Sequence, residues 1–129
     1  MLRAAVFMLL VGGVVLAQPL PVNQLPMRPT KTGQKLVADK LKELDDFRLT
    51  DDFKTKGVGK ASKQYGWIER LQSTRAEAMK QKTCSYEEWG ALCDIEGMTY
   101  DYLRTRGQDT KNTIRAREGI EKVLRMKAD

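Results

Sequence analysis

The sequence predicts an all-α fold: an up-and-down four-helix bundle with an extended, proline-rich N-terminal leader. Four segments after residue 33 place apolar residues at helical spacing, and no stretch alternates as a strand would. All four prolines lie between residues 18 and 30. With 129 residues, 31% of them charged, the chain suits one small domain. We therefore predict a signal peptide at 1–17, a leader at 18–33 and a helical bundle at 34–129.

Residues 1–17 have the order of a secretory signal. Arg3 gives a positive start, Ala4–Ala17 is an apolar run, and Val15-Leu16-Ala17 places small or apolar residues before a cleavage point. A membrane anchor is the competing interpretation, but these 14 residues would reach only ~21 Å as a helix, short of the ~30 Å hydrocarbon core. We therefore predict a cleaved export signal. An uncleaved anchor and the lumen-targeting half of a bipartite plastid address remain open.

Residues 18–33 are predicted to form the extended leader. Proline fixes φ and lacks a backbone donor, so Pro19, Pro21, Pro26 and Pro29 favour polyproline II backbone without a core of its own. Such a leader serves either as a spacer or as an arm that lies along a partner surface.

The first predicted helix covers about residues 34–47, where Val37, Leu41, Leu44 and Phe47 follow i, i+4, i+7 spacing. Residues 49–59 are predicted to be a connection, because glycines break the pattern there. The acidic pairs at 45–46 and 51–52 lack the ligand pattern of a calcium loop, so we interpret them as solvated acidic side chains.

The second predicted helix covers about residues 60–82. Its apolar stripe consists of Ala61, Tyr65, Ile68, Leu71, Ala78 and Met79. Trp67 lies beside this stripe, so we expect it to be partly exposed and available as a binding anchor. Lys63 and Arg70 belong to the basic side of the same helix and are further candidates for partner contact.

The third predicted helix opens with Ser85 and Glu88 at capping-box spacing. Gly97 and Thr99 favour a break, so residues 85–106 form either one helix or two. The last helix covers about residues 109–127, with Asp109 as its N-cap. Its apolar face is predicted to consist of Thr113, Ala116, Ile120, Val123 and Leu124.

Cys84 and Cys93 are the only cysteines, and export would bring them to an oxidising compartment. A helix between them would separate them by roughly 13 Å, whereas the Cα atoms of a disulfide lie within about 7 Å. Either residues 85–90 form a turn and the cysteines are bonded, or the helix is intact and they are not. We favour the disulfide, and with it a shorter third helix.

The composition argues for a binding protein. The chain has no histidine, which excludes a Ser-His-Asp or Cys-His centre and an imidazole zinc site within it. We predict no enzymatic activity, no cofactor and no metal. The net charge of +6 favours an acidic partner surface, but acids interleave with the bases along the helices. A nucleic-acid-binding stripe would carry fewer acids and more exposed aromatics, so no nucleic-acid partner is predicted.

In organisation the chain resembles the PsbQ-type extrinsic subunits of photosystem II. The segments that carry the resemblance are Tyr65–Leu71, which is aromatic and basic, and Met98–Leu103, which contains Asp-Tyr. The resemblance covers most of the chain from Gln18. It implies a cofactor-free bundle in the thylakoid lumen that docks through its leader and a basic face onto lumenal membrane-protein surfaces, protecting the oxygen-evolving site. It carries over no catalytic or ligand residue.

The sequence thus predicts an exported, non-catalytic accessory subunit, peripheral to the membrane and monomeric within a larger membrane-protein complex. The thylakoid lumen is the favoured location, with the periplasm or secretion as alternatives. The predicted partner-binding residues are Pro19, Pro21, Pro26, Arg28, Pro29, Lys63, Trp67 and Arg70. The alternative function is a secreted, free-standing helical protein that binds a small ligand or an anionic surface.

Overall fold

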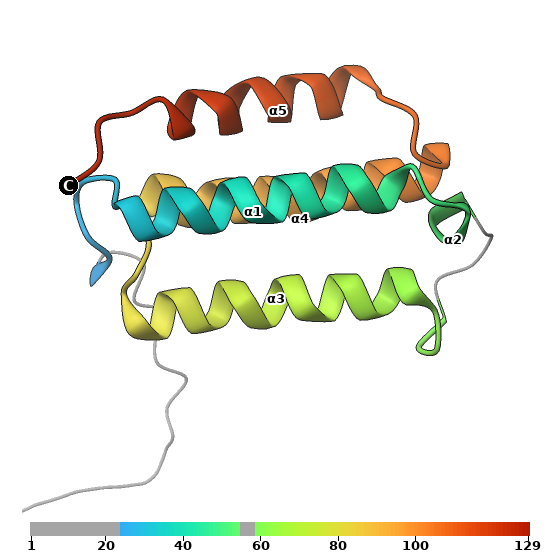
Figure 1. The fold of residues 1–129 in the computed structure, drawn as a ribbon, viewed down its shortest axis with the longest axis horizontal. Coiled ribbons are helices and arrows are strands. Elements are labelled where there is room, and N and C mark those ends of the chain that lie inside the picture. Colours follow the sequence, from blue (N-terminus) through green and yellow to red (C-terminus); the bar gives the residue numbers. More distant parts are fainter. Residues whose placement is uncertain (1–23, 55–58) are drawn as a thin grey trace, which may run out of the picture.

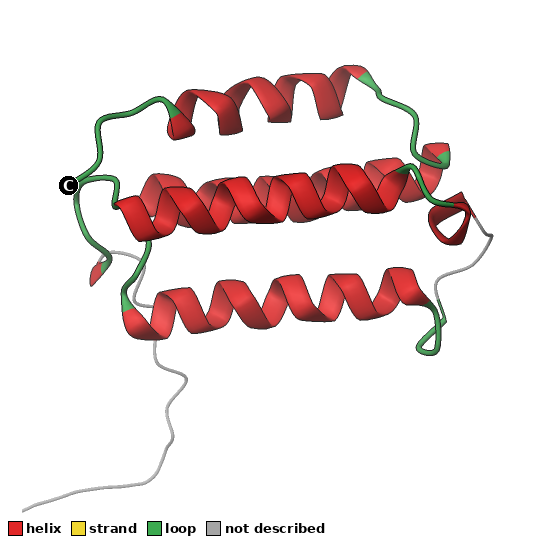
Figure 2. Cartoon of the chain, viewed as in Figure 1, coloured by secondary structure: helices red, strands yellow, loops and turns green. Residues whose placement is uncertain are grey.

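The computed structural model of the protein describes residues 24–54 and 59–129. These residues are mostly helical and contain no strand, so the all-α prediction is confirmed for them (Figure 2). The helices are α1 (Lys31–Arg48), α2 (Asp51–Lys54), α3 (Lys63–Gln81), α4 (Tyr86–Thr105) and α5 (Lys111–Leu124). The predicted signal peptide lies outside the described residues.

The four long helices lie along one another, and each runs opposite to the long helix before it (Figure 1). The helix α4 packs against α1, α3 and α5, and α1 also packs against α5. Among consecutive long helices, α1 and α3 have the fewest close backbone contacts, although Phe47 and Lys40 of α1 contact the Trp67 ring of α3. The array therefore has packed contacts around α4 and a loose edge between its first two long helices.

Because α4 packs against three other helices, its side chains form the centre of the hydrophobic core. Five of its side chains are buried against the other helices: Ala91, Leu92, Ile95, Met98 and Tyr102. The stripe predicted for the first helix supplies three more buried residues, Val37, Leu41 and Leu44. From the predicted face of α5, only Thr113 and Ile120 are buried, and Ala116 and Leu124 pack at the edge of the core.

The helix boundaries follow the caps. The predicted capping box is confirmed: the Ser85 hydroxyl accepts from the Glu88 backbone, and the Glu88 carboxylate accepts from the Ser85 backbone. The helix α4 then runs unbroken past Gly97 and Thr99, because the Thr99 hydroxyl donates to the Ile95 carbonyl at 2.9 Å within the helix. Residues 85–106 therefore hold one helix.

Two predicted starting points are wrong. The helix α1 begins at Lys31, inside the predicted leader of 18–33, because Thr30 is its N-cap and accepts from the Gly33 backbone at 2.8 Å. The N-cap of α5 is Thr110, which exchanges hydrogen bonds with Thr113. The Asp109 side chain instead accepts a hydrogen bond from Tyr102 at 2.6 Å.

The predicted disulfide is also wrong, since Cys84 and Cys93 are both free. Cys84 precedes the Ser85 cap, and Cys93 lies more than two turns into α4. The intact helix keeps the two sulfur atoms apart, which is the alternative that the spacing left open. Burial, and then the nearby charge of Glu88, raises the pKa of the Cys84 thiol to about 11.

The described part of the leader lies against the helices. Leu25 and Pro29 are buried, Pro26 is half-buried, and Arg28 is exposed. The Pro29 carbonyl accepts from the Asp129 backbone at 2.9 Å, which ties the leader to the C-terminal residue. Residues 24–30 are therefore packed on the helices of the same molecule. Pro19 and Pro21 lie outside the described residues.

Candidate partner-binding groove

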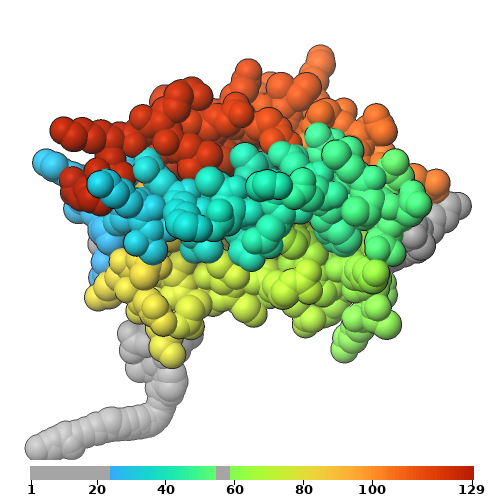
Figure 3. Space-filling view, in the orientation of Figure 1, coloured from blue at the N-terminus to red at the C-terminus, as the bar shows by residue number. Residues whose placement is uncertain are grey.

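A groove runs between α1 and α3, whose backbones approach each other less closely than those of the other consecutive long helices. Three hollows of about 490, 590 and 350 Å³ follow one another along it. Figure 3 shows this face of the molecule, with α1 drawn in cyan to green and α3 in green to yellow. We call this feature the α1–α3 groove. Its α1 side consists of Leu36, Lys40, Glu43, Asp46 and Phe47, and its α3 side of Gly66, Trp67, Glu69, Arg70, Ser73, Thr74, Glu77, Ala78 and Gln81.

Helical periodicity builds both sides of the groove. On α1, Leu36, Lys40, Glu43 and Phe47 follow i, i+4, i+7, i+11 spacing and so lie on one face of the helix. Several of the facing positions on α3 carry small side chains: Gly66, Ser73, Thr74 and Ala78. Small side chains on one wall leave space where a larger residue would fill the contact between the helices.

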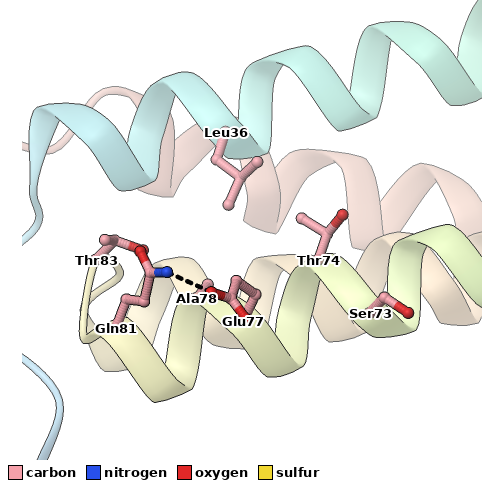
Figure 4. A pocket seen from close by; sticks show the side chains of 7 residues that line it. All are labelled: Leu36, Ser73, Thr74, Glu77, Ala78, Gln81 and Thr83. Atoms are coloured by element: carbon pink, nitrogen blue, oxygen red, sulfur yellow. Dashed lines mark hydrogen bonds between the residues drawn. The ribbon is translucent and has the colours of Figure 1, made fainter.

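The hollow nearest the start of α1 is the most apolar part of the groove. Figure 4 shows Leu36 pointing from α1 toward Thr74 and Ala78 on α3. The Ala78 side chain is buried and forms the floor. On the rim, the Gln81 side chain donates to the Glu77 carboxylate, and the loop residue Thr83 closes this end.

The hollow at the other end of the groove is lined by aromatic residues and charges. Trp67 lies at its base and is only 2% exposed, so the prediction of a partly exposed Trp67 is wrong. Its indole N–H donates to the Thr99 hydroxyl at 3.1 Å, which fixes the ring against α4. Phe47 packs beside it with ring centroids 6.3 Å apart, and the Lys40 ammonium lies 5.7 Å from the Trp67 ring centroid.

The predicted site residues fall into three separate places. Arg70 is exposed and lines the same hollow as Trp67, so the structure brings these two together. Lys63 lies apart from the groove, paired with the Asp52 carboxylate at 3.0 Å. Residues 26–29 of the leader lie at the other end of the molecule, where Arg28 reaches Asp129 at 3.8 Å.

Sequence reasoning missed most of the residues that make the groove. The signal that could have found them is the stripe of small residues at helical spacing through 66–78, opposite a stripe of larger residues in the preceding helix. Leu36 was missed because it lies next to Val37, which belongs to the core stripe.

No group of three or more cysteine and acidic side chains within residues 24–54 and 59–129 is arranged to hold a metal. The acidic side chains considered for calcium pair with cations instead: Asp45 with Arg117, Asp46 with Lys42, and Asp52 with Lys63. Among the helices of these ranges, none combines the length and apolar character of a membrane span.

The largest polar cluster lies where α1 and α4 end and α5 begins, and we call it the charged network. The guanidinium of Arg117 contacts both oxygens of Asp45, at 2.6 and 2.7 Å, and also donates to the Tyr102 hydroxyl at 3.0 Å. Arg48 donates to Asp45 and to the Gly107 carbonyl, at 3.1 and 2.7 Å. Burial opposes the ionised form of Asp45, but hydrogen bonds and charge from Arg117 and then Arg48 outweigh it, so the Asp45 pKa is lowered.

The opposite end of the array is held by one buried carboxylate. Glu88 is 0% exposed and accepts from the backbone of Thr30 and of Ser85, each at 2.8 Å. It thus joins the N-caps of α1 and α4, two helices whose positive ends favour a negative group there. The Thr30 hydroxyl also donates to the Thr83 carbonyl at 2.7 Å, which draws in the loop before α4.

In both clusters the carboxylates accept hydrogen bonds from neighbouring side chains or backbone groups. Comparison of the chain with protein-family models, with curated proteins and with solved structures finds no match in any of the three. The α1–α3 groove is therefore the candidate functional site on its geometry alone.

Proposed function

We propose that the protein is a non-catalytic accessory subunit of a larger membrane-protein assembly and that its α1–α3 groove receives a helix of the partner. The single observation that carries the proposal is the loose edge between two consecutive long helices. In an up-and-down four-helix bundle, which is the architecture we propose for α1, α3, α4 and α5, consecutive helices would normally close such an edge.

The dimensions and chemistry of the groove favour a helix as the occupant. From Leu36 to Phe47 the groove follows twelve residues of α1, which rise by about 16 Å along the helix axis, or three turns. Small residues on α3 permit close approach of a second backbone, and Leu36, Ala78 and Phe47 offer apolar contact at both ends. A helix with apolar residues at i, i+3 or i+4, and i+7 would fit such a surface.

The rim supports selection by charge as well as by shape. Arg70 is exposed, and no ion pair of Arg70 is found among the described residues, whereas Lys40 at the groove is paired with Glu43 at 3.2 Å. Arg70 is thus available to a carboxylate of the partner beside the buried Trp67 and Phe47. An arginine next to aromatic side chains is a common composition for an energetically important contact.

The proposal includes location and processing. An export signal at 1–17 would place the protein in an oxidising compartment, with the thylakoid lumen favoured and the periplasm as the alternative. The partner would be a membrane-protein complex, possessing a surface helix on the side where the protein is exported. Residues 18–30 would then follow the cleavage point and lead into α1.

Sedimentation of the native protein tests the proposal. We expect the protein, extracted gently in low salt, to migrate with a large membrane complex, and Ser73→Trp to abolish this co-migration because the indole would fill the groove. Asn112→Trp, at an exposed position of α5 away from the groove, is the matched control and should migrate as the unaltered chain does.

A free species of unaltered protein in both low and high salt would reject the accessory role and favour the secreted, free-standing binder. Equal behaviour of the two tryptophan variants, with co-migration retained, would reject the groove as the contact.

A further inference from the structure

One end of the molecule gathers residues from three parts of the chain, and we call it the leader end. It consists of residues 24–31, 80–86 and 125–129. Besides the Glu88 bonds, the Gln34 side chain donates to the carbonyls of Val123 and Met126, at 3.1 and 2.7 Å. The Asp129 carbonyl accepts from the Lys31 backbone at 3.4 Å. These bonds hold the leader, the loop before α4 and the C-terminal residues as one surface.

The leader end is strongly basic. Its three segments carry six exposed cations and a single acid, Asp129; the cations are Arg28, Lys31, Lys80, Lys82, Arg125 and Lys127. Of these six, only Arg28 has an ion pair among the described residues, with Asp129 at 3.8 Å. The neighbouring Glu88 is fully buried, and Glu87 is partly buried. The positive charge of this end is therefore directed to solvent.

The opposite end differs in this respect. There the cations Arg48 and Arg117 share Asp45, Arg104 pairs with Asp101 at 2.7 Å, and Lys63 pairs with Asp52. The opposite end also carries exposed cations without an ion pair among the described residues, Lys54, Lys60, Arg106 and Lys111, but several acidic side chains accompany them. The three segments of the leader end carry only one acidic side chain.

Exposed apolar side chains occur among the cations. Met27 is 89% exposed, Tyr86 61% and Met126 37%, and each comes from a different segment of the leader end. Single exposed apolar residues are ordinary on a protein surface, but three of them on one basic surface match the mixed composition that anionic membranes bind. Tyrosine in particular is enriched where one part of the ring meets lipid and the hydroxyl stays in water.

We propose that the leader end is a membrane-docking surface that binds the headgroups of anionic phospholipids. The six cations contact the phosphate and acidic headgroup oxygens, while Met27, Tyr86 and Met126 enter the boundary between headgroups and acyl chains. Basic residues with interspersed apolar ones are the composition that binds such surfaces, and each cation near the surface strengthens binding by about five-fold. This inference goes beyond the proposed function and does not need an occupied groove.

Binding of the full chain to vesicles tests the inference. The probes are phosphatidylcholine vesicles with and without a third of phosphatidylglycerol. We expect the unaltered protein to bind the anionic vesicles at least ten-fold more tightly, and the difference to shrink in high salt. With the same acyl chains in both compositions, the difference between them isolates the charged contribution.

Two triple variants with equal net charge locate the surface. Lys31→Gln, Lys80→Gln and Lys127→Gln together should weaken anionic binding at least ten-fold. Lys54→Gln, Lys60→Gln and Lys111→Gln together should weaken it less than about two-fold, because these exposed lysines lie away from the leader end. Lys31 and Lys111 each occupy the first position of a helix, so the two variants also match in their local effects.

A second measurement follows the apolar contact. Tyr86→Trp should be quenched by lipids brominated in the upper acyl chain, whereas Tyr100→Trp, 50% exposed in the unaltered chain but on the α3-facing side of α4, should not. Equal binding to both vesicle compositions, or equal loss in the two triple variants, would overturn the inference and leave an acidic protein surface as the source of the charge complementarity. Failure here leaves the sedimentation of Ser73→Trp unaffected, so the two proposals fail independently.

Discussion

The two ends of the helical array are held together by opposite means. At the leader end, a single carboxylate that no water reaches accepts from the backbone of two helix caps. At the other end, the charged network shares two arginines among Asp45, Tyr102 and Asp109, and its ion-paired side chains are 18–43% exposed. The first end depends on satisfied backbone donors, and the second depends on charge pairs that solvent partly screens.

This difference between the two ends indicates which side chains stabilise the fold and which are free to contact a partner. A buried acceptor is expensive to remove because its partners cannot turn to water, whereas a partly exposed pair is replaced by hydration. Buried hydrogen bonds therefore stabilise the leader end, while most of its exposed cations have no ion pair among the described residues. The charged network uses its cations internally and has few left for a partner.

The largest effect is expected from Glu88→Ala. The variant leaves the backbone N–H groups of Thr30 and Ser85 without their acceptor in a buried site, and it loosens the caps of α1 and α4 together. We expect a loss of about 3 kcal/mol in the free energy of unfolding, measured by urea denaturation.

The control for this variant is Glu87→Ala. Glu87 also lies in the first turn of α4, but it is partly buried and its buried Oε1 has no hydrogen-bond partner among the described residues. Its removal should change stability by less than about 0.5 kcal/mol. Equal losses of unfolding free energy in the two variants would mean that the negative charge in the first turn of α4 stabilises this end, and not the hydrogen bonds by which Glu88 joins the two helix caps.

The capping half of this junction is visible in the sequence, whereas its tertiary half is not. Ser85 and Glu88 have capping-box spacing, and the structure confirms it. Nothing local indicates that Glu88 also accepts from Thr30, 58 residues away, because that contact depends on α1 and α4 lying side by side with their first turns at the same end. Helical periodicity predicts a face to bury but does not select the neighbour.

The groove was even less accessible to prediction. The apolar stripe predicted for the first helix gave three core residues of α1 correctly, Val37, Leu41 and Leu44, yet the same reasoning placed Trp67 partly in solvent. It is buried because its N–H finds Thr99, a polar residue inside the core that no apolar pattern includes. The predicted disulfide was wrong because the expected oxidising compartment was given more weight than the helical spacing between the two cysteines. The structure follows the helical spacing.

The second prediction compares two glycines. A Cβ at Gly33 would collide with the Glu88 carboxylate and would lie 2.7 Å from the Thr30 hydroxyl oxygen. Gly33→Ala should therefore lower the free energy of unfolding by about 2 kcal/mol, even though alanine favours the helix. Gly97→Ala in α4, where a Cβ meets no atom of the described chain within 4 Å, should instead raise it by about 0.5–1 kcal/mol. Thermal unfolding that shows the same sign for both would contradict the close packing of the leader end.

The third prediction concerns the charged network and pH. Arg117→Met removes both hydrogen bonds to Asp45, and we expect a loss of about 1–2 kcal/mol near neutral pH. Because the folded pKa of Asp45 is below its ordinary value of 3.8, its contribution is complete above that value and is lost as the pH falls through the folded pKa. The difference between the unaltered protein and the variant should accordingly narrow below about pH 4.

Arg115→Met is the control for the charged network, since Arg115 is exposed on the same helix and has no ion pair among the described residues. Urea denaturation of the three proteins between pH 7 and pH 2.5 gives the comparison. A gap between the unaltered protein and Arg117→Met that stays constant down to pH 2.5 would show that Arg117 acts through packing and not through the Asp45 carboxylate.

The smallest effect is expected from Asp109→Asn, at the outer edge of the charged network. The hydrogen bond from Tyr102 is the main cause that lowers the Asp109 pKa, and an asparagine oxygen can still accept that bond. The side chain is 43% exposed, so the lost charge toward Arg48, at 3.8 Å, is largely screened. We expect a change of about 0.5 kcal/mol or less. A loss as large as that of Arg117→Met would mean that the charged network acts as one unit. The contrast between the buried hydrogen bonds of the leader end and the solvent-screened pairs of the charged network would then not hold.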